Sequence, residues 1–96
     1  MSAFVVSRVR VRDVEKIKQY AAAAAETIAE FGGQIVLRGQ FSASLTGKGE
    51  PHSTGIIAFP DLETANAWYD SAAYQAIVPL REEAGEISLT VYQAAP

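Results

Sequence analysis

The chain has 96 residues, no cysteine and a formal net charge of −3. This length predicts a single domain that spans 1–96. The acidic excess argues against nucleic acid as a partner, and the composition excludes disulfide and thiolate chemistry. No apolar run approaches the roughly 20 residues of a membrane span, and Arg8 comes too early for a secretory signal to precede it. We therefore expect a cytoplasmic protein that has no membrane partner.

Residues 3–11 alternate between two faces, which predicts a first strand. Asp13 is placed to cap a helix of about five turns, because apolar side chains then recur every three or four residues. Gly32 and Gly33 should end this helix, since glycine adopts the left-handed conformation without penalty. The predicted buried stripe comprises Val14, Ile17, Ala21, Ala24, Ile28 and Phe31.

Three more strands are predicted at 34–41, 53–59 and 86–92, because these segments alternate or are rich in β-branched and aromatic residues. A loop rich in Ser, Gly and Pro joins the first two of them. Its Gly-x-Gly segment at 46–49 is not followed by a helix, so we expect a hairpin loop there and not a phosphate site.

A second helix, in pieces, should lie between the last two strands. Pro60 and Asp61 start it, and Ser71 is expected to interrupt it and cap the next piece. Pro79 has no N–H and should bend or restart that piece. Gly85 should end it.

The order β-α-β-β-α-β predicts an α+β, ferredoxin-like fold, with a four-stranded antiparallel sheet that carries the helices on one face. The other face would be too apolar to stand bare in water, so we expect a homodimer closed sheet against sheet, with a polar-lined cavity between or beside the sheets. Val5, Val9, Val11, Ile35, Leu37, Ile57, Phe59, Ile87, Leu89 and Val91 should face the helices, and Phe4, Val6, Arg8, Val36, Arg38, Ile56, Ser88, Thr90 and Tyr92 should face away.

Several short motifs occur together: F-G-G at 31–33, R-G at 38–39, F-P at 59–60, A-x-x-W-Y at 65–69, S-x-x-Y-Q at 71–75 and P-L-R at 79–81. In combination they resemble the family called domain of unknown function 1330, of the dimeric α/β-barrel superfamily, over nearly the whole chain. The resemblance implies this fold and a dimer, but no reaction, because the superfamily spans cofactor-free oxygenation, haem-linked reactions and lactone isomerisation.

Two positions depart from the family pattern. Ala58 stands where members often carry an acid, and His52 stands where they often carry Arg. If that acid and base act as a pair, the resemblance implies a changed or lost activity in this chain.

One histidine, no cysteine and no His/Glu pair at helical spacing predict no metal site, and no cofactor is expected. His52 and Ser53 are adjacent on an extended chain and point to opposite faces, which argues against serine hydrolysis. His52 and Tyr92 remain the candidates for proton exchange, and the alternative for His52 is an ordinary loop residue.

Arg8 shares its predicted face with Arg38, and two guanidinium groups at one cavity would favour a small organic anion by bidentate hydrogen bonding. The alternative is an ion pair between Arg8 and Glu50 or Glu86. Arg10 and Arg12 continue the row, and Arg12 is expected to be a solvated strand end.

The aromatic segment 67–81 contains four further candidate ligand-binding residues: Trp68, Tyr69, Tyr74 and Arg81. They could wall a pocket over the sheet, or they could only lock a corner of the fold.

Three functions are therefore open. The dimer binds, and can transform, a small polar or anionic molecule; it is a non-catalytic interaction module with a structural aromatic corner; or it is a cofactor-free oxygenase. Whether the chain is an enzyme is left open by the sequence.

Overall fold

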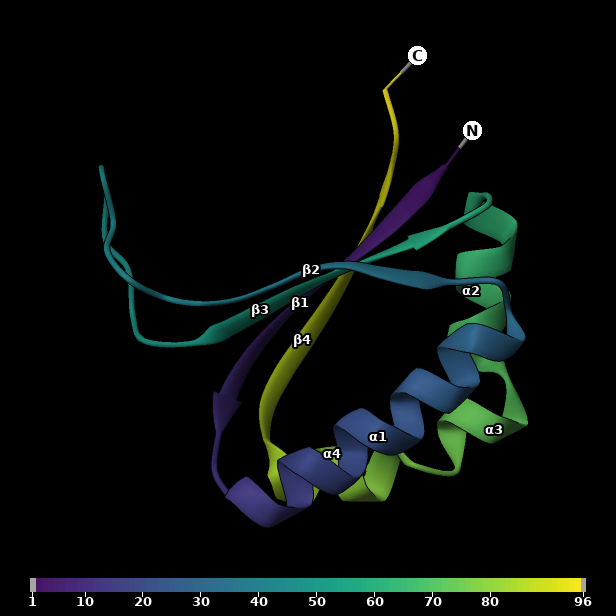
Figure 1. The fold of residues 1–96 in the computed structure, drawn as a ribbon, viewed down its shortest axis with the longest axis horizontal. Helices are drawn as coiled ribbons and strands as arrows, with labels where there is room; N and C mark the ends of the chain where they lie inside the picture. Colours follow the sequence, from purple (N-terminus) through teal and green to yellow (C-terminus); the bar gives the residue numbers. More distant parts are fainter. Residues whose placement is uncertain (1, 96) are drawn as a thin grey trace.

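The computed structural model describes residues 2–95, and its four strands form one antiparallel sheet of order β2-β3-β1-β4. The helices lie together on one side of this sheet, so the predicted ferredoxin-like fold is confirmed (Figure 1). The elements in chain order are β1 (Ala3–Val11), α1 (Val14–Glu30), β2 (Gln34–Gln40), β3 (Ser53–Phe59), α2 (Leu62–Asp70), α3 (Ala72–Gln75), α4 (Val78–Ala84) and β4 (Gly85–Gln93).

Local chemistry sets both ends of α1. The Asp13 side chain accepts a hydrogen bond from the Lys16 backbone N–H at 3.0 Å, which satisfies one of the free donors of the first turn. Gly32 follows the helix with φ +70°, a conformation that a residue with a Cβ adopts only with strain. The predicted cap and stop of this helix are therefore confirmed.

The segment after β3 is divided into three short helices, as expected. The Ser71 hydroxyl accepts from the Tyr74 N–H at 3.1 Å and donates to the Trp68 carbonyl at 2.7 Å, so one side chain ends α2 and starts α3. Pro79 occupies the first turn of α4, where its missing N–H is no loss. Gly85 then begins β4, and a Cβ at this position would collide with the carbonyl of Arg10 on the paired strand.

The core lies between the helices and the sheet. Trp68, Tyr74 and Phe59 are its largest fully buried side chains. The ring centroid of Trp68 lies 4.6 Å from that of Tyr74 and 5.3 Å from that of Phe59. This aromatic cluster joins α2 and α3 to the sheet.

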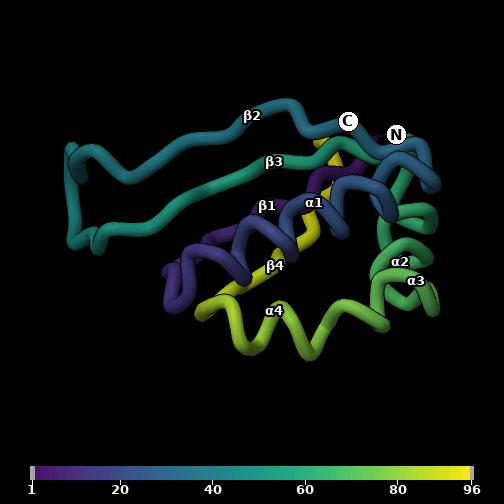
Figure 2. The backbone as a smooth tube through the Cα atoms, turned by 60° about the horizontal axis from the view of Figure 1, so that its bottom comes forward, coloured from purple at the N-terminus to yellow at the C-terminus, as the bar shows by residue number. Residues whose placement is uncertain are grey.

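The opposite side of the sheet, called the open face here, carries no helix. Val6 pairs with Ile56 and Thr90 on the two strands beside β1, and Phe4 lies two residues before Val6 on the same face, as expected. Two of its large side chains, Leu37 and Tyr92, are 50% and 56% exposed. The β2–β3 hairpin extends past the ends of the helices and leaves its loop far from them (Figure 2).

Candidate functional site

A β-bulge in β2 separates the two arginines that were expected to act together. Ile35 pairs with Ile57, but Leu37 pairs with Ile56, so Val36 is an extra residue in the strand. One added residue reverses the alternation of side chains beyond it. Arg38 therefore lies opposite Gly55 on the helix-facing side.

Two predictions are consequently wrong. Arg38 does not share a face with Arg8, because Arg8 pairs with Thr54 and Ser88 on the open face. Leu37 faces away from the helices instead of toward them.

The displaced Arg38 lines a cavity of about 550 Å³ between α1 and the sheet. This volume is in the range of small-molecule sites in proteins. Trp68 lies in the same wall, so one predicted arginine and one predicted aromatic residue meet here. Most of the remaining surface is apolar and comes from Val9, Ile17, Ala21, Ala24, Ile28 and Ile57.

Few polar groups reach this cavity. Among residues 2–95, no hydrogen bond or ion pair joins the Arg38 guanidinium to another residue. The Ser7 hydroxyl is already bound, since it accepts from the Gly55 N–H at 3.0 Å. Arg38 is thus a free cation at the edge of an apolar hollow, which suits a ligand with one anionic end.

Tyr20 is another polar residue in the cavity wall, and it is linked to Arg81 through Tyr74. The two hydroxyl oxygens of Tyr20 and Tyr74 are 2.7 Å apart, and Arg81 Nη1 lies 3.0 Å from the Tyr74 oxygen. A guanidinium only donates, so the Tyr74 oxygen accepts from Arg81, and one of the two tyrosine hydroxyl groups donates to the other.

Burial raises the pKa of Tyr20 well above its usual value, and the hydrogen bond to Tyr74 raises it further. Tyr20 therefore stays protonated and can act as a hydrogen-bond donor at neutral pH. It is not suited to act as a base.

The other aromatic candidates have mainly structural contacts. Trp68 donates its indole N–H to Thr27 Oγ1 at 2.9 Å, and Thr27 donates in turn to the Ala24 carbonyl. Tyr74 is fully buried beside it. Tyr69 is 37% exposed and lines a smaller hollow of about 190 Å³. A ligand-binding role for Tyr69, Tyr74 or Arg81 stays a prediction.

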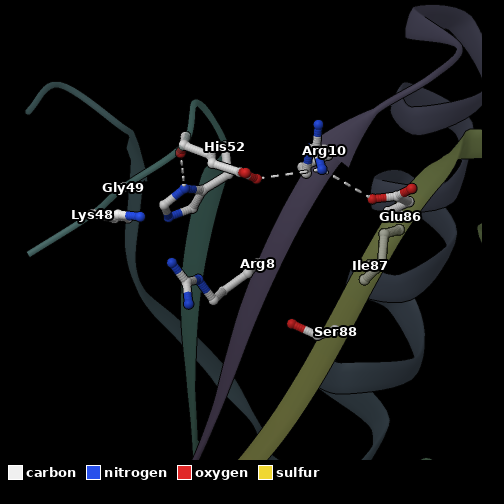
Figure 3. A pocket seen from close by; sticks show the side chains of 9 residues that line it. Arg8, Arg10, Lys48, Gly49, His52, Glu86, Ile87 and Ser88 are labelled. Atoms are coloured by element: carbon white, nitrogen blue, oxygen red, sulfur yellow. Dashed lines mark hydrogen bonds and ion pairs between the residues drawn. The ribbon is translucent and has the colours of Figure 1, made fainter.

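The remaining candidates lie on the open face. Arg8 and His52 line a separate hollow of about 520 Å³ at one end of this face (Figure 3). Tyr92 pairs with Phe4 at the other end, away from His52. The alternative of an ion pair between Arg8 and Glu50 or Glu86 is not found among residues 2–95; Arg10 contacts both acids instead, at 3.4 Å. The structure thus does not bring Arg38, His52 and Tyr92 together.

The two positions that depart from the family pattern are also far apart. Ala58 and His52 lie at opposite ends of β3, about 20 Å apart at 3.3 Å per residue. An acid at position 58 and a base at position 52 would not touch within one subunit.

Arg12 is the last residue of the expected row. Its Nη1 donates to the Glu82 carbonyl at 2.8 Å, so it ties the end of β1 to α4 and is more than a solvated strand end.

Sequence reasoning missed Tyr20, Thr27 and Lys48. The first two belong to the buried stripe of α1, which is rotated from the predicted one: Tyr20, Ala24, Thr27 and Ile28 are buried, whereas Val14 is 59% exposed. The spacing of Tyr20 to Ala24 and Ile28, four residues each, was the available signal. Lys48 lies in a loop without periodicity, where no such signal exists.

Within residues 2–95, no helix has the length and apolar character needed to cross a membrane. The same residues contain no cluster of three or more His, Asp or Glu side chains that could hold a metal ion.

A family profile described as domain of unknown function (DUF1330) matches residues 2–95. Comparison with curated proteins found no match. Among solved structures, a protein of unknown function from Rhodopseudomonas palustris superposes with a TM-score of 0.82 at 18% identity, covering 99% of this chain and 83% of that one.

Two other structures share the fold at lower identity. SnoaB from Streptomyces nogalater, a cofactor-independent oxygenase, has a TM-score of 0.72 at 11% identity and covers 99% of this chain and 94% of its own. A dimeric ferredoxin-like protein of unknown function from Thermobifida fusca has a TM-score of 0.63 at 10% identity, with 98% and 92% covered.

Proposed function

Because the chain belongs to the domain of unknown function (DUF1330) family, which carries no assigned reaction, we propose a function from its cavity: it binds a small organic molecule with an apolar body and an anionic end. The observation that carries this proposal is the unpaired guanidinium of Arg38 at the edge of an apolar hollow of about 550 Å³. Arg38 anchors the anionic end, and Trp68 and Tyr20 form part of the wall.

The size and chemistry of the cavity support this assignment over a purely structural role for the aromatic corner. A site built only for packing would be filled by side chains, since protein interiors are close-packed. The hollow also has the composition typical of ligand sites, with apolar walls and few polar groups.

The test uses 2-naphthoate as the probe and its neutral carboxamide as the matched control. Trp68 is the chain's one tryptophan, so its indole N–H gives a single NMR signal at the cavity wall. We expect naphthoate to shift this signal and to bind more tightly than the carboxamide. Arg38→Gln should weaken naphthoate binding about tenfold, because a hydrogen bond to a charged group contributes about 1.5–3 kcal/mol, and should leave carboxamide binding unchanged.

A second pair of variants tests the place of binding. Ala21 is exposed and lines the cavity, whereas Ala22 is exposed but lies about 100° around the helix. Ala21→Phe should block both probes, and Ala22→Phe should block neither. If naphthoate moves no Trp68 signal, or if both variants behave alike, this function is wrong.

The similarity to the cofactor-independent oxygenase SnoaB favours one second candidate, oxygenation of an electron-rich aromatic molecule in the same cavity. The apolar walls of the cavity support it. An oxygen electrode with 1,4-dihydroxynaphthalene checks it: oxygen uptake no faster than in protein-free buffer, or unchanged by Ala21→Phe, would exclude this activity.

We also propose that two copies associate through the open face. The exposure of its apolar side chains supports this, as does the dimeric protein from Thermobifida fusca with the same fold.

A further inference from the structure

The hollow on the open face has a charge pattern that the cavity function does not use. It lies where the 41–52 loop leaves the sheet, on the side opposite to Arg38. Three cationic and two acidic side chains line it. The two carboxylates, of Glu50 and Glu86, both contact Arg10 at 3.4 Å.

This pairing leaves two cations without an acidic partner. Among residues 2–95, neither Arg8 nor Lys48 takes part in an ion pair. Both line the hollow together with His52, whereas Glu86 lies beyond Arg10 from them (Figure 3). Three cationic and two acidic side chains thus leave the hollow with a net charge of +1, although the chain as a whole has a net charge of −3.

The hydrogen bond of His52 fixes which of its nitrogens is available. Nδ1 lies 2.6 Å from the Glu50 carbonyl oxygen, and a carbonyl only accepts, so Nδ1 holds a proton. Nε2 is then the nitrogen that gains or loses a proton. The ring packs against Phe41, with centroids 5.6 Å apart, which helps to hold this orientation. With Nε2 protonated, His52 adds a third positive group beside Arg8 and Lys48.

We propose that this hollow is a binding site for a small oxyanion, distinct from the cavity between α1 and the sheet. The Arg8 guanidinium offers paired N–H donors that match the oxygens of a sulfate, phosphate or carboxylate group. Lys48 supplies a point charge from the 41–52 loop. The Ser88 hydroxyl, next to Arg8 on β4, lines the same hollow. The hollow shares no cationic residue with the cavity between α1 and the sheet. The oxyanion proposal therefore does not depend on whether naphthoate binds in that cavity.

Sodium sulfate is the probe, compared with sodium chloride at equal ionic strength on the full chain. Backbone amide NMR signals around Arg8, Lys48 and His52 should shift with sulfate and saturate, and should not shift with chloride. Arg8→Gln should weaken sulfate binding about tenfold, because it removes a charged hydrogen-bonding group. Lys48→Gln should weaken it about threefold, since a flexible, exposed point charge contributes less.

One variant serves as the control. Lys18→Gln removes an exposed lysine on α1 and should bind sulfate as the unaltered chain does. Lys48 is in the loop and not in the core, so its variant remains informative even if Arg8→Gln does not fold.

A further readout is the imidazole of His52, the chain's one histidine. Its NMR signals should shift as sulfate is added, because the ring lines the hollow. The proposal is overturned if sulfate and chloride act alike, or if Arg8→Gln and Lys48→Gln both bind sulfate normally.

Discussion

Tyr20 and Tyr74 share one hydrogen bond in the core, with 2.7 Å between their oxygens. At the scale of single residues this contact matters because it joins the cavity wall to Arg81, which has 13% of its side chain exposed. A phenol held in this way is a poor acid. The raised pKa of Tyr20, caused first by burial and then by the bond to Tyr74, makes the fold itself sensitive to alkaline pH.

Stability should therefore fall as the pH rises above about 10, the ordinary value for tyrosine. The unfolded chain releases the Tyr20 proton there while the folded chain keeps it, so the free energy of unfolding decreases by up to about 1.4 kcal/mol per pH unit for this one group. Urea unfolding between pH 8 and pH 11 measures the slope. Tyr20→Phe should make it shallower, and Tyr92→Phe, at a residue 56% exposed, should not. If the free energy of unfolding falls with pH equally steeply for Tyr20→Phe and the unaltered chain, this role of Tyr20 is wrong.

At the scale of elements, Ser71 holds the junction between α2 and α3 with two hydrogen bonds, one accepted and one donated. Trp68 and Tyr74 lie on the two sides of this junction, so its angle determines how they pack.

Ser71→Ala removes both bonds and should lower the free energy of unfolding by about 1–2 kcal/mol. Ser71→Asp can still accept from the Tyr74 N–H but cannot donate to the Trp68 carbonyl, so it should recover only part of the loss. Thermal or urea unfolding should show the unaltered chain as the most stable, Ser71→Asp as intermediate and Ser71→Ala as the least stable. An Asp variant no more stable than the Ala variant would show that the cap contributes nothing.

The elements also show what sequence can predict. The order of strands and helices along the chain, the caps at Asp13 and Ser71 and the restart at Pro79 follow from local patterns and were predicted. The bulge at Val36 was not, because β2 is an exposed edge strand in which a polar/apolar pattern has no buried face to mark the change. This single residue moves Arg38 from the predicted site on the open face to the helix-facing side of the sheet.

At the scale of the whole molecule, the two faces of the sheet have different surroundings. The helix-facing side has the cavity, whereas the open face has apolar side chains at one end and the Arg8 hollow at the other. Residues several positions apart on different strands meet in each site, which a one-dimensional pattern does not predict.

The apolar end of the open face should pair two copies of the chain. Light scattering after size-exclusion chromatography should give about twice the chain mass of 10.3 kDa at micromolar concentration. Leu37→Lys should shift the mass toward the monomer, since a buried, unpaired charge at an interface is costly. Val14→Lys, at a residue 59% exposed on α1, should leave the dimer intact. A monomeric mass for the unaltered chain would exclude this assembly.

The two ends of the described chain meet at the edge of the sheet, where the Ala94 N–H donates to the Ser2 carbonyl at 2.9 Å (Figure 1). A short linker could join them, and the chain could be reopened in the exposed 41–52 loop, a kind of place where circular permutation is tolerated. Such a permutant would keep the cavity between α1 and the sheet intact and would cut the loop that carries Lys48 and His52. Moving the chain ends into the 41–52 loop would thus allow the cavity to be studied in the absence of the hollow on the open face.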